Sequence, residues 1–292
     1  MQPASPSRLL FDLLATPCAL RIERLIPLAR DLHAGGRTFD LSAVKAGMDS
    51  EDDCWPWEDP LYEIKDGVAV VDFAGPMVKG YDDITCWFWG LASIDRLQKT
   101  MLELGDDPQV RTVVLNIDSG GGMCMGTPEL GDAISALNAK KPVLSFTSGM
   151  MCSAAYWSGC SGSQVYSTRS AMVGSIGTYL AVYDYSKYFE AIGISVELFK
   201  RGAFKGMFTP GTSLSDDQRT WLDDQIGRTN AAFTSHVRAQ RGDIADSTMQ
   251  GQWFDGEQAV ELGLVDRVVS GLPEVVMLAK AIAARPFAAA LR

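Results

Sequence analysis

The feature that most constrains the fold of this chain is an alternation of strand-like and helix-like segments over Val68–Val269. Short apolar runs rich in β-branched residues, such as Val110–Ile117 and Pro142–Phe146, read as buried strands. Between them, apolar residues recur every three or four positions over Leu91–Leu104 and Thr127–Ala139, which predicts helices. This alternation predicts an α/β fold with a mainly parallel sheet and right-handed crossover helices.

Segments further along the chain carry clear signals as well. The long stretch from Ser215 to about Arg241 begins with a Ser-x-x-Gln capping box formed by Ser215 and Gln218, which predicts that a helix starts there. Short β-rich runs at Gln164–Ser167 and Val196–Phe199 predict two more strands.

The composition is that of an ordinary globular protein. The 292 residues are 47% hydrophobic and 21% charged, which suffices for one sizeable core or two small domains. The formal net charge of −10 and the lack of a Lys/Arg-rich patch argue against a nucleic acid partner, because phosphate backbones attract basic surfaces.

The cysteines and the apolar runs indicate the compartment. Six cysteines are scattered without a C-x-x-C pair, which is typical of reduced thiols rather than of disulfides or a zinc site. We therefore expect no metal and no cofactor. No run reaches the roughly 18 apolar residues that span a bilayer, and the segment after Arg8 is interrupted by Asp12 and makes a poor signal peptide. A cytoplasmic protein without a membrane anchor is expected.

The segment Ser148–Trp157 holds the candidate nucleophile. It follows the strand Pro142–Phe146 and opens into small residues compatible with a helix, so Ser153 stands at a strand-to-helix corner. There, backbone N–H groups and the helix dipole can stabilise an oxyanion. The alternative is that Ser153 is only an N-cap, as most serines before helices are. Its neighbour Cys152 is expected to be a small buried apolar side chain.

The base that such a serine requires must come from a histidine or a lysine. His33 lies in a weakly patterned N-terminal stretch and His236 lies inside the long helix, so a Ser-His-Asp triad is not favoured. A lysine can serve where a dry pocket lowers its pKa. Lys205 lies in a loop of small and apolar residues, and its alternative role is that of a solvated loop cation.

A run of glycines, Gly120–Gly122, follows the strand Val110–Ile117. Its backbone N–H groups could face an oxyanion, but the run equally fits a plain tight turn or a phosphate-binding loop. No Gly-Lys-Ser/Thr follows it, so it matches neither the P-loop nor the dinucleotide fingerprint.

Taken together, four separated motifs resemble one family. Asp118–Gly122, Ser148–Trp157, Gly174–Gly177 and Lys205 occur in the order of the signal peptide peptidase A (protein C) family. That family consists of serine peptidases with a Ser/Lys dyad and includes phage head-maturation proteases. The resemblance covers roughly Val68–Val269. It implies an α/β fold of the Clp-protease/crotonase type, with a mainly parallel sheet and crossover helices.

Carried over residue by residue, the resemblance implies a serine endopeptidase site. Ser153 would be the nucleophile and Lys205 the general base. Ser175 would hydrogen-bond the lysine and keep it neutral and aimed. The N–H groups of Gly121 and Ala154 would form the oxyanion hole. One departure is visible, because the family's glycine turn commonly reads Ser-Pro-Gly-Gly and this chain has Gly120 in the place of the proline.

Side chains around the nucleophile allow two interpretations. They would either line a pocket for small or apolar substrate side chains or pack the nucleophile helix into the core. These residues are Met150, Met151, Tyr156 and Trp157.

We expect three parts in the chain, namely an N-terminal extension and linker over 1–60, a peptidase domain over 61–271 and a C-terminal helical tail over 272–292. The resemblance implies a ring-like homo-oligomer, since family members often need neighbouring subunits to build the substrate groove. Without an anchor, the chain resembles the phage and prophage branch. Its substrates would then be scaffold, portal or capsid proteins, met in the cytoplasm or transiently within a procapsid.

Other functions remain open from the sequence. A housekeeping protease of the signal-peptide-peptidase type would use the same residues. A crotonase-type acyl-CoA enzyme would share the fold and the glycine turn but would use carboxylates, so an active-serine probe distinguishes it. A non-catalytic assembly factor is the last alternative, and the joint presence of Ser153, Ser175 and Lys205 speaks against it.

Overall fold

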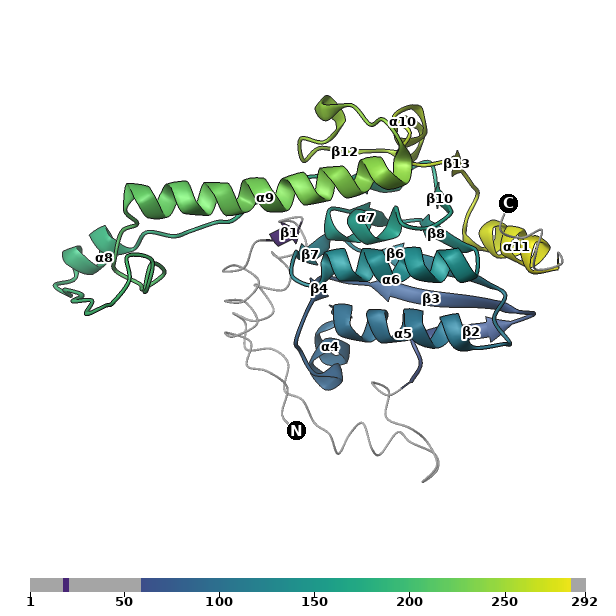
Figure 1. The fold of residues 1–292 in the computed structure, drawn as a ribbon, viewed down its shortest axis with the longest axis horizontal. Helices are drawn as coiled ribbons and strands as arrows, with labels where there is room; N and C mark the ends of the chain where they lie inside the picture. The colour runs from purple at the N-terminus through teal and green to yellow at the C-terminus, as the bar shows by residue number, and fades with distance from the viewer. Residues whose placement is uncertain (1–17, 21–58, 285–292) are drawn as a thin grey trace, which may run out of the picture.

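The computed structural model describes residues 18–20 and 59–284, and its main body is a six-stranded sheet. The strands are β2 (Tyr62–Lys65), β3 (Val68–Ala74), β6 (Thr112–Asp118), β8 (Val143–Thr147), β10 (Gln164–Ser167) and β13 (Arg267–Val268). Their spatial order is β13-β10-β8-β6-β3-β2, and every pair except β2–β3 is parallel (Figure 1). The predicted α/β fold with a mainly parallel sheet is confirmed.

Helices cover both faces of this sheet. On one face lie α5 (Ile94–Asp106) and α6 (Thr127–Lys140), and on the other lies α11 (Leu272–Ala283) (Figure 1). Alternate residues of β6 point into the two layers, so that Val113 belongs to the α5/α6 cluster and Val114 to the α11 cluster. Strands buried on both faces carry near-continuous apolar runs, as expected for parallel sheets. The α11 helix therefore contributes to the core.

The antiparallel edge of the sheet is a hairpin that the sequence analysis missed. Asp66 and Gly67 join β2 to β3 with φ values of 55° and 77°. Type I′ hairpin turns of two residues require such left-handed backbone at both positions, and Asp-Gly is a preferred pair for them. The signal was therefore present in the sequence.

Two smaller sheets and several short helices complete the body. One sheet has the order β1 (Cys18–Leu20), β7 (Gly121–Met123), β4 (Met77–Val78), β5 (Ala92–Ser93), and the other has the order β12 (Trp253–Phe254), β11 (Met172–Gly174), β9 (Met150–Cys152). The short helices are α4 (Asp83–Trp89), α7 (Ala154–Gly159), α10 (Gly256–Glu261) and a 3₁₀ turn at Asp246–Thr248.

Gly122 is required where β7 meets β4. A Cβ atom at this position would lie 2.1 Å from the Met77 carbonyl oxygen. We expect Gly122→Ala to destabilise the fold by about 1–3 kcal/mol, as overpacking does. Urea unfolding would measure it, with Gly227→Ala as the matched control, because nothing lies within 4 Å of a Cβ atom there. Equal unfolding midpoints for the Gly122→Ala variant and the wild type would contradict the expectation.

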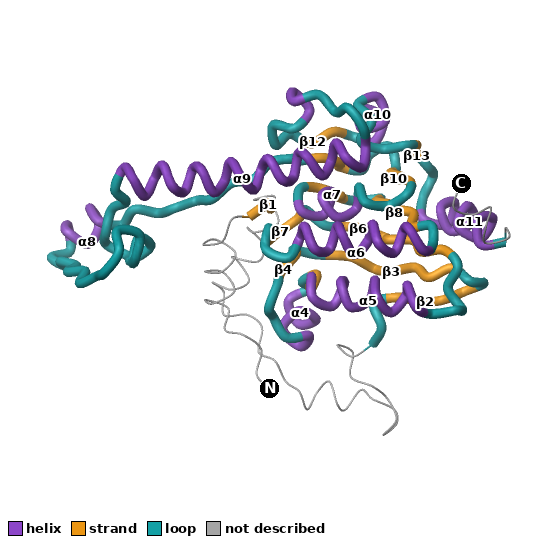
Figure 2. Tube along the Cα trace, viewed as in Figure 1, coloured by secondary structure: helices purple, strands orange, loops and turns teal. Residues whose placement is uncertain are grey.

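An arm extends from the body at the left of Figure 1. We define the arm as residues 179–225; its base is marked by Thr178 Oγ1, which donates to the Ile226 carbonyl at 3.3 Å. It contains α8 (Ser186–Ala191) and the first part of α9 (Asp216–Arg241), and the remainder is mostly loop (Figure 2). The predicted strand at Val196–Phe199 is wrong, because these residues are loop. A β-rich run forms a strand only beside a pairing partner.

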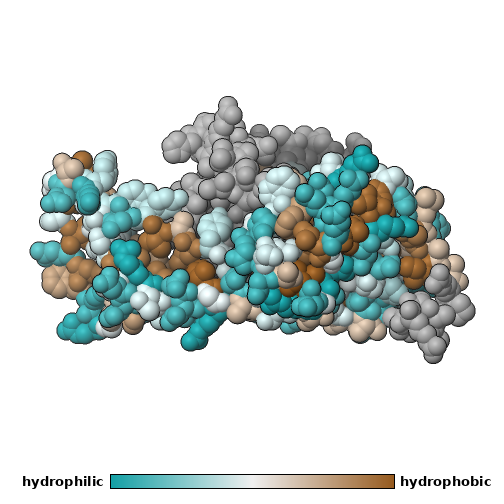
Figure 3. Space-filling view, turned by 90° about the horizontal axis from the view of Figure 1, so that it is seen from above, coloured by the Kyte–Doolittle hydropathy of each residue, from teal (hydrophilic) through white to brown (hydrophobic). Residues whose placement is uncertain are grey.

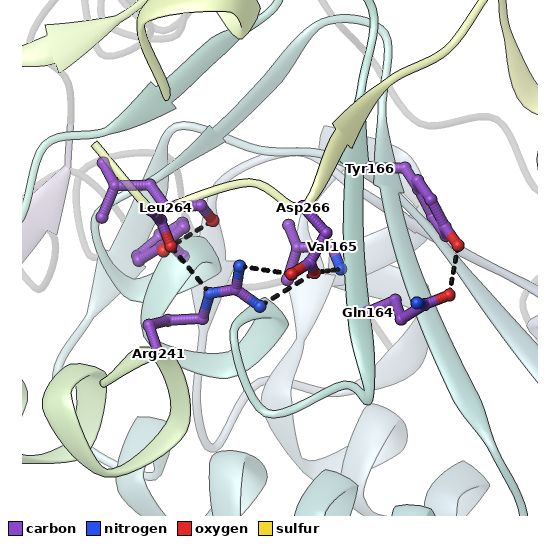
Figure 4. A network of polar contacts seen from close by, with 8 residues as sticks. Gln164, Val165, Tyr166, Arg241, Leu264 and Asp266 are labelled. Carbon is purple, nitrogen blue, oxygen red and sulfur yellow. Dashed lines mark hydrogen bonds and ion pairs between the residues drawn. The ribbon is translucent and has the colours of Figure 1, made fainter. Parts of the chain in front are cut away.

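The far end of α9 is fastened to the body. The helix starts at the predicted Ser215–Gln218 capping box, with both reciprocal hydrogen bonds present. At its other end, the Arg241 guanidinium donates to both Asp266 carboxylate oxygens at 2.9 Å (Figure 4). Asp266 in turn accepts the Val165 N–H at 2.6 Å. Bidentate pairs of this kind fix orientation, so α9 carries the arm from a firm base.

Candidate active site

Ser153 lies at the corner between β9 and α7. Its backbone has φ 59° and ψ −126°, its residue is 2% exposed, and its side chain makes no capping hydrogen bond to α7. Ser153 thus stands at the N-cap position of α7 without its side chain capping the helix, so capping does not account for its hydroxyl. L-residues rarely adopt this region of φ/ψ space, and holding one there costs about 1–3 kcal/mol. A serine held at a sharp, strained strand-to-helix turn is the arrangement of a nucleophile elbow.

Ser175 directly follows the strand β11, as Ser153 directly follows the neighbouring strand β9. In the parallel pair β9–β11, Cys152 is in register with Gly174, so the two serines are the next residues of their strands. The Ser153 N–H donates to the Gly174 carbonyl at 2.7 Å. Ser175 also has a positive φ, 51°, and its N–H donates to the Gln252 carbonyl at 2.7 Å. The structure therefore brings together two of the predicted site residues.

The glycine turn is bonded to the same strand β9. The Ser119 N–H donates to the Met150 carbonyl at 2.7 Å, and the Cys152 N–H donates to the Ser119 carbonyl at 3.1 Å. Asp118 Oδ1 accepts the Met150 N–H at 3.0 Å. These bonds place the turn directly next to the corner at Ser153.

Backbone donors for an oxyanion lie on both sides of this corner. Ala154 is the first residue of α7, and the first helical bond is the one from the Trp157 N–H to the Ser153 carbonyl. The Ala154 N–H therefore has no partner within the helix. The Gly121 N–H donates to Ser119 Oγ at 3.1 Å.

Ser119 is a residue that the sequence analysis missed as part of the site. Its Oγ donates to the Gly75 carbonyl at 2.7 Å and accepts the Gly121 N–H. It thus holds the glycine turn from within, and a hydroxyl residue directly before a glycine run was the available signal.

The predicted pocket residues lie in or beside the core. Met151 and Tyr156 are fully buried, and the Tyr156 hydroxyl donates to the Leu264 carbonyl at 2.9 Å. Trp157 stacks on Phe233 of α9 with ring centroids 4.5 Å apart. Met150 is buried as well, at the start of β9. The packing role is thus observed for these side chains.

A cavity of about 410 Å³ nonetheless adjoins Trp157. It lies between the β7–α6 connection, α7 and α9. Its lining residues are Cys124, Met125, Pro128, Trp157, Arg228, Thr229 and Ala232. A role of Trp157 in binding a substrate side chain stays a prediction.

The buried thiols are inert side chains of this core. Cys86, Cys124, Cys152 and Cys160 are buried thiols outside any disulfide, and Cys152 is fully buried, as expected for a small apolar residue. Burial raises the pKa of the Cys160 thiol to about 12. Over residues 59–284, no group of His, Cys, Asp and Glu could hold a metal ion, and no helix is long and apolar enough to cross a bilayer.

His236 lies near α7, where its ring packs against the buried residues at the end of that helix. Its Nε2 is 2.9 Å from Ser161 Oγ, just beyond the end of α7, and its ring lies 6.4 Å from that of Trp157. Ser161 is 1% exposed, which leaves no room for a substrate. His33 lies outside the described residues.

Burial lowers the pKa of His236 below its usual 6.5, against an opposing effect of Asp132. Since the unfolded chain then binds the proton more readily, stability is complete above the unfolded pKa and is lost as the pH falls below about 6.5. We expect the free energy of unfolding to fall less steeply between about pH 7.5 and 5.5 in His236→Gln than in the wild type. The variant His33→Gln is the control, and identical slopes for all three proteins would exclude His236.

Lys205 lies apart from the other predicted site residues. It is exposed in the loop between α8 and α9, on the arm. Gln218 Nε2 donates to the Ala203 carbonyl at 2.7 Å, which ties this loop to the first turn of α9. Fifteen residues of helix, about 22 Å long at 1.5 Å per residue, separate Gln218 from Phe233, where α9 meets Trp157. The single chain therefore does not bring Lys205 to Ser153.

Comparisons with known proteins give consistent relatives. A sequence model described as Peptidase family S49 matches residues 135–283. The chain is 26% identical over 270 residues to Capsid assembly protease C of Escherichia phage lambda, which covers 92% of this chain and 61% of that protein. It is 26% identical over 224 residues to Head-tail preconnector protein GP5 of Enterobacteria phage P21, covering 76% of this chain and 44% of that protein. The chain thus spans less than two thirds of the length of either relative.

Among solved structures, an enoyl CoA hydratase/isomerase (crotonase) from Legionella pneumophila aligns with a TM-score of 0.47 and 15% identity. The alignment covers 79% of this chain and 78% of that one.

Proposed function

This chain belongs to peptidase family S49, and we propose that it is a serine endopeptidase whose nucleophile is Ser153. The observation that carries the proposal is the strained backbone at Ser153, whose hydroxyl does not cap the helix α7 that begins at Ala154. A structural serine at a helix start would cap the helix in relaxed backbone. Strain of this kind persists where the surroundings enforce it, and it gathers at active sites.

The proposed reaction is acyl transfer to Ser153. Its Oγ attacks the carbonyl carbon of the scissile peptide bond while a lysine amine takes the hydroxyl proton. The Ala154 and Gly121 N–H groups stabilise the tetrahedral oxyanion, and Gly121 exchanges Ser119 Oγ for this new acceptor. The lysine then protonates the leaving amine, and water hydrolyses the acyl-enzyme. Loss of one oxyanion donor typically costs about 10²–10³ in rate.

The lysine in this proposal is Lys205 of a second copy of the chain. In its own subunit, Lys205 lies on the arm, at the far end of α9 from Trp157. If a neighbouring copy supplies Lys205, the Ser/Lys pair of the family motif is complete although the two residues lie apart within one chain. Ser175, next to Ser153 in register, would position the incoming amine.

The surface of the arm supports a second copy as its partner. Apolar residues gather over the arm at the left of Figure 3. Phe199, Tyr183 and Tyr188 are 89%, 60% and 60% exposed, although large apolar side chains are usually buried. Exposed apolar patches of this kind mark interaction sites. A heterologous contact between arm and body, repeated around a closed ring, would complete every site.

We further propose that the substrates are phage head proteins. The support comes from the two relatives named for capsid assembly and head-tail connection, which align with 92% and 76% of this chain. Scaffold, portal and capsid proteins would be cleaved in a procapsid. The family also speaks against the acyl-CoA alternative.

The direct experiment is a cleavage assay with unbiased substrates. The purified chain would be incubated with a denatured protein extract, and the new termini would be mapped by mass spectrometry. Cleavage that stops in Ser153→Ala supports the proposal, whereas cleavage that persists in this variant refutes it.

A further inference from the structure

The strand β1 occupies the free edge of the strand that follows the glycine turn. On one edge β7 pairs with β4, with Met77 opposite Gly122. On the other edge it pairs with β1, the described strand Cys18–Leu20, in antiparallel orientation (Figure 1). The order β1-β7-β4-β5 makes β1 the outermost strand. A segment about a hundred residues earlier in the chain thus covers the edge of β7.

The register of this pair points the segment toward the catalytic corner. Cys18 lies opposite Met123, Ala19 opposite Gly122 and Leu20 opposite Gly121. Because the strands are antiparallel, β1 runs toward the glycine turn, and Leu20 is its last residue. The N–H group of Gly121 is one of the two proposed oxyanion donors. Because Leu20 is the residue paired with Gly121, its carbonyl group is the one nearest in register to that donor.

The glycine turn is also hydrogen-bonded to β9, the strand that ends just before Ser153. Ser119 exchanges backbone hydrogen bonds with Met150 and Cys152 of β9, and Cys152 precedes the nucleophile. An open strand edge next to a catalytic corner is suited to an extended peptide, which adds to a sheet through main-chain hydrogen bonds. A strand of three residues makes few main-chain hydrogen bonds. We therefore expect β1 to dissociate from β7 readily, as a cleaved substrate has to.

We propose that Cys18–Leu20 occupies the substrate strand of the chain's own peptidase site, and that the enzyme cleaves its N-terminal segment between Leu20 and Arg21. The proposal rests on the proposed serine peptidase function. Ser153 Oγ bonds to the carbonyl carbon of Leu20, and the bond to the Arg21 nitrogen breaks as that nitrogen takes up the proton. Water then cleaves the ester, which restores the serine and leaves a carboxylate on Leu20. The products are a peptide that ends at Leu20 and a chain that begins at Arg21.

In this position the uncut segment also competes with external substrates for the edge of β7. An external substrate needs the same edge of β7, so it binds only after β1 has been cut or displaced. Peptide cleavage by freshly made, uncut chain is therefore expected to begin with a lag.

A cross-link tests the docking independently of activity. In Ser153→Ala, the further change Met123→Cys places a thiol opposite Cys18. Paired residues of antiparallel strands have Cα atoms about 4.5–5.5 Å apart, which a disulfide can bridge. We expect mild oxidation to link Cys18 to the new thiol, as mapped by peptide mass. The same chain with Cys18→Ser, and Met125→Cys in place of Met123→Cys, are the controls. Absence of the Cys18 link, or equal linkage at position 125, overturns the docking.

Intact-mass analysis tests the cleavage. The wild type is expected to lose residues 1–20 and to gain an N-terminus at Arg21, while Ser153→Ala keeps its full mass. Arg21→Pro should block this cut, because proline restricts the residue before it and lacks the N–H. Since the segment then stays uncut, cleavage of external peptides by this variant should remain slow, where that of the wild type speeds up after its lag.

The outcomes separate the two proposals. A wild-type chain that cleaves external peptides but retains residues 1–20, or loses them at another bond, overturns the self-cleavage and leaves the proposed function standing. A wild-type chain that cleaves neither external peptides nor its own N-terminal segment overturns both the proposed function and the self-cleavage. The cross-link then tests only whether Cys18–Leu20 pairs with β7.

Discussion

Replacement of Ser153 by alanine is expected to lower the rate of peptide cleavage by about 10³-fold or more, as loss of a nucleophile does in serine peptidases. Alanine removes the Oγ that attacks the substrate and retains the Cβ, so the strained backbone at φ 59° is neither relieved nor made worse. The variant should therefore unfold at the same urea concentration as the wild type. The loss of activity can then be assigned to chemistry rather than to folding.

Ser158→Ala is the matched control for this experiment. Ser158 lies in the same helix α7 and is fully buried, but its Oγ donates to the Ala154 carbonyl at 3.1 Å within the helix. We expect this variant to retain most of its activity. A Ser153→Ala chain with the wild-type rate, or equal losses in the two variants, would remove Ser153 as the nucleophile.

A mixture of two inactive variants is expected to regain activity. Ser153→Ala keeps the lysine and Lys205→Ala keeps the serine, so neither forms a complete site alone. If Lys205 reaches Ser153 of a neighbouring copy, a ring assembled from equal amounts of both restores about a quarter of the sites. The two variants would be unfolded together, refolded as a mixture and assayed with the same peptides.

The neighbouring lysine of the arm provides the control. Lys200 lies in the same exposed loop, where its Nζ donates to the Ala203 carbonyl at 3.0 Å, and Lys200→Ala should remain active on its own. If sedimentation shows mixed assemblies that stay inactive, the two residues are not shared between copies. An active Lys205→Ala variant would exclude Lys205 as the base.

Local signals in the sequence were sufficient for the body of the fold. The apolar runs at β6 and β8 and the capping box of α9 appear where they were predicted. The strand-to-helix corner at Ser153 was also predicted, since a buried strand followed by small residues specifies it. The strand β9 was missed because its three residues precede a helix without turn residues between them.

Long-range placement could not be predicted in the same way. Periodicity indicates that Ser215 begins a helix, but it does not indicate whether that end lies over the body or away from it. The position of Lys205 depends on that direction, and the predicted strand at Val196–Phe199 failed for the related reason that its pairing partner is absent from the arm. The pairing of Cys18–Leu20 with β7 is likewise a contact between distant segments, which no local pattern specifies.

The backbone at Ser153 and Ser175 has a consequence for how this chain can evolve. Of the described non-glycine residues, the ones with positive φ are Asp66 in the hairpin turn and these two serines. Glycine would relieve each serine position, by about 1–3 kcal/mol where the strain is greatest. Selection for stability alone would thus favour glycine at both positions, and a descendant freed from peptidase work could gain stability by single substitutions there. Retention of both serines therefore requires continued selection for their hydroxyl groups.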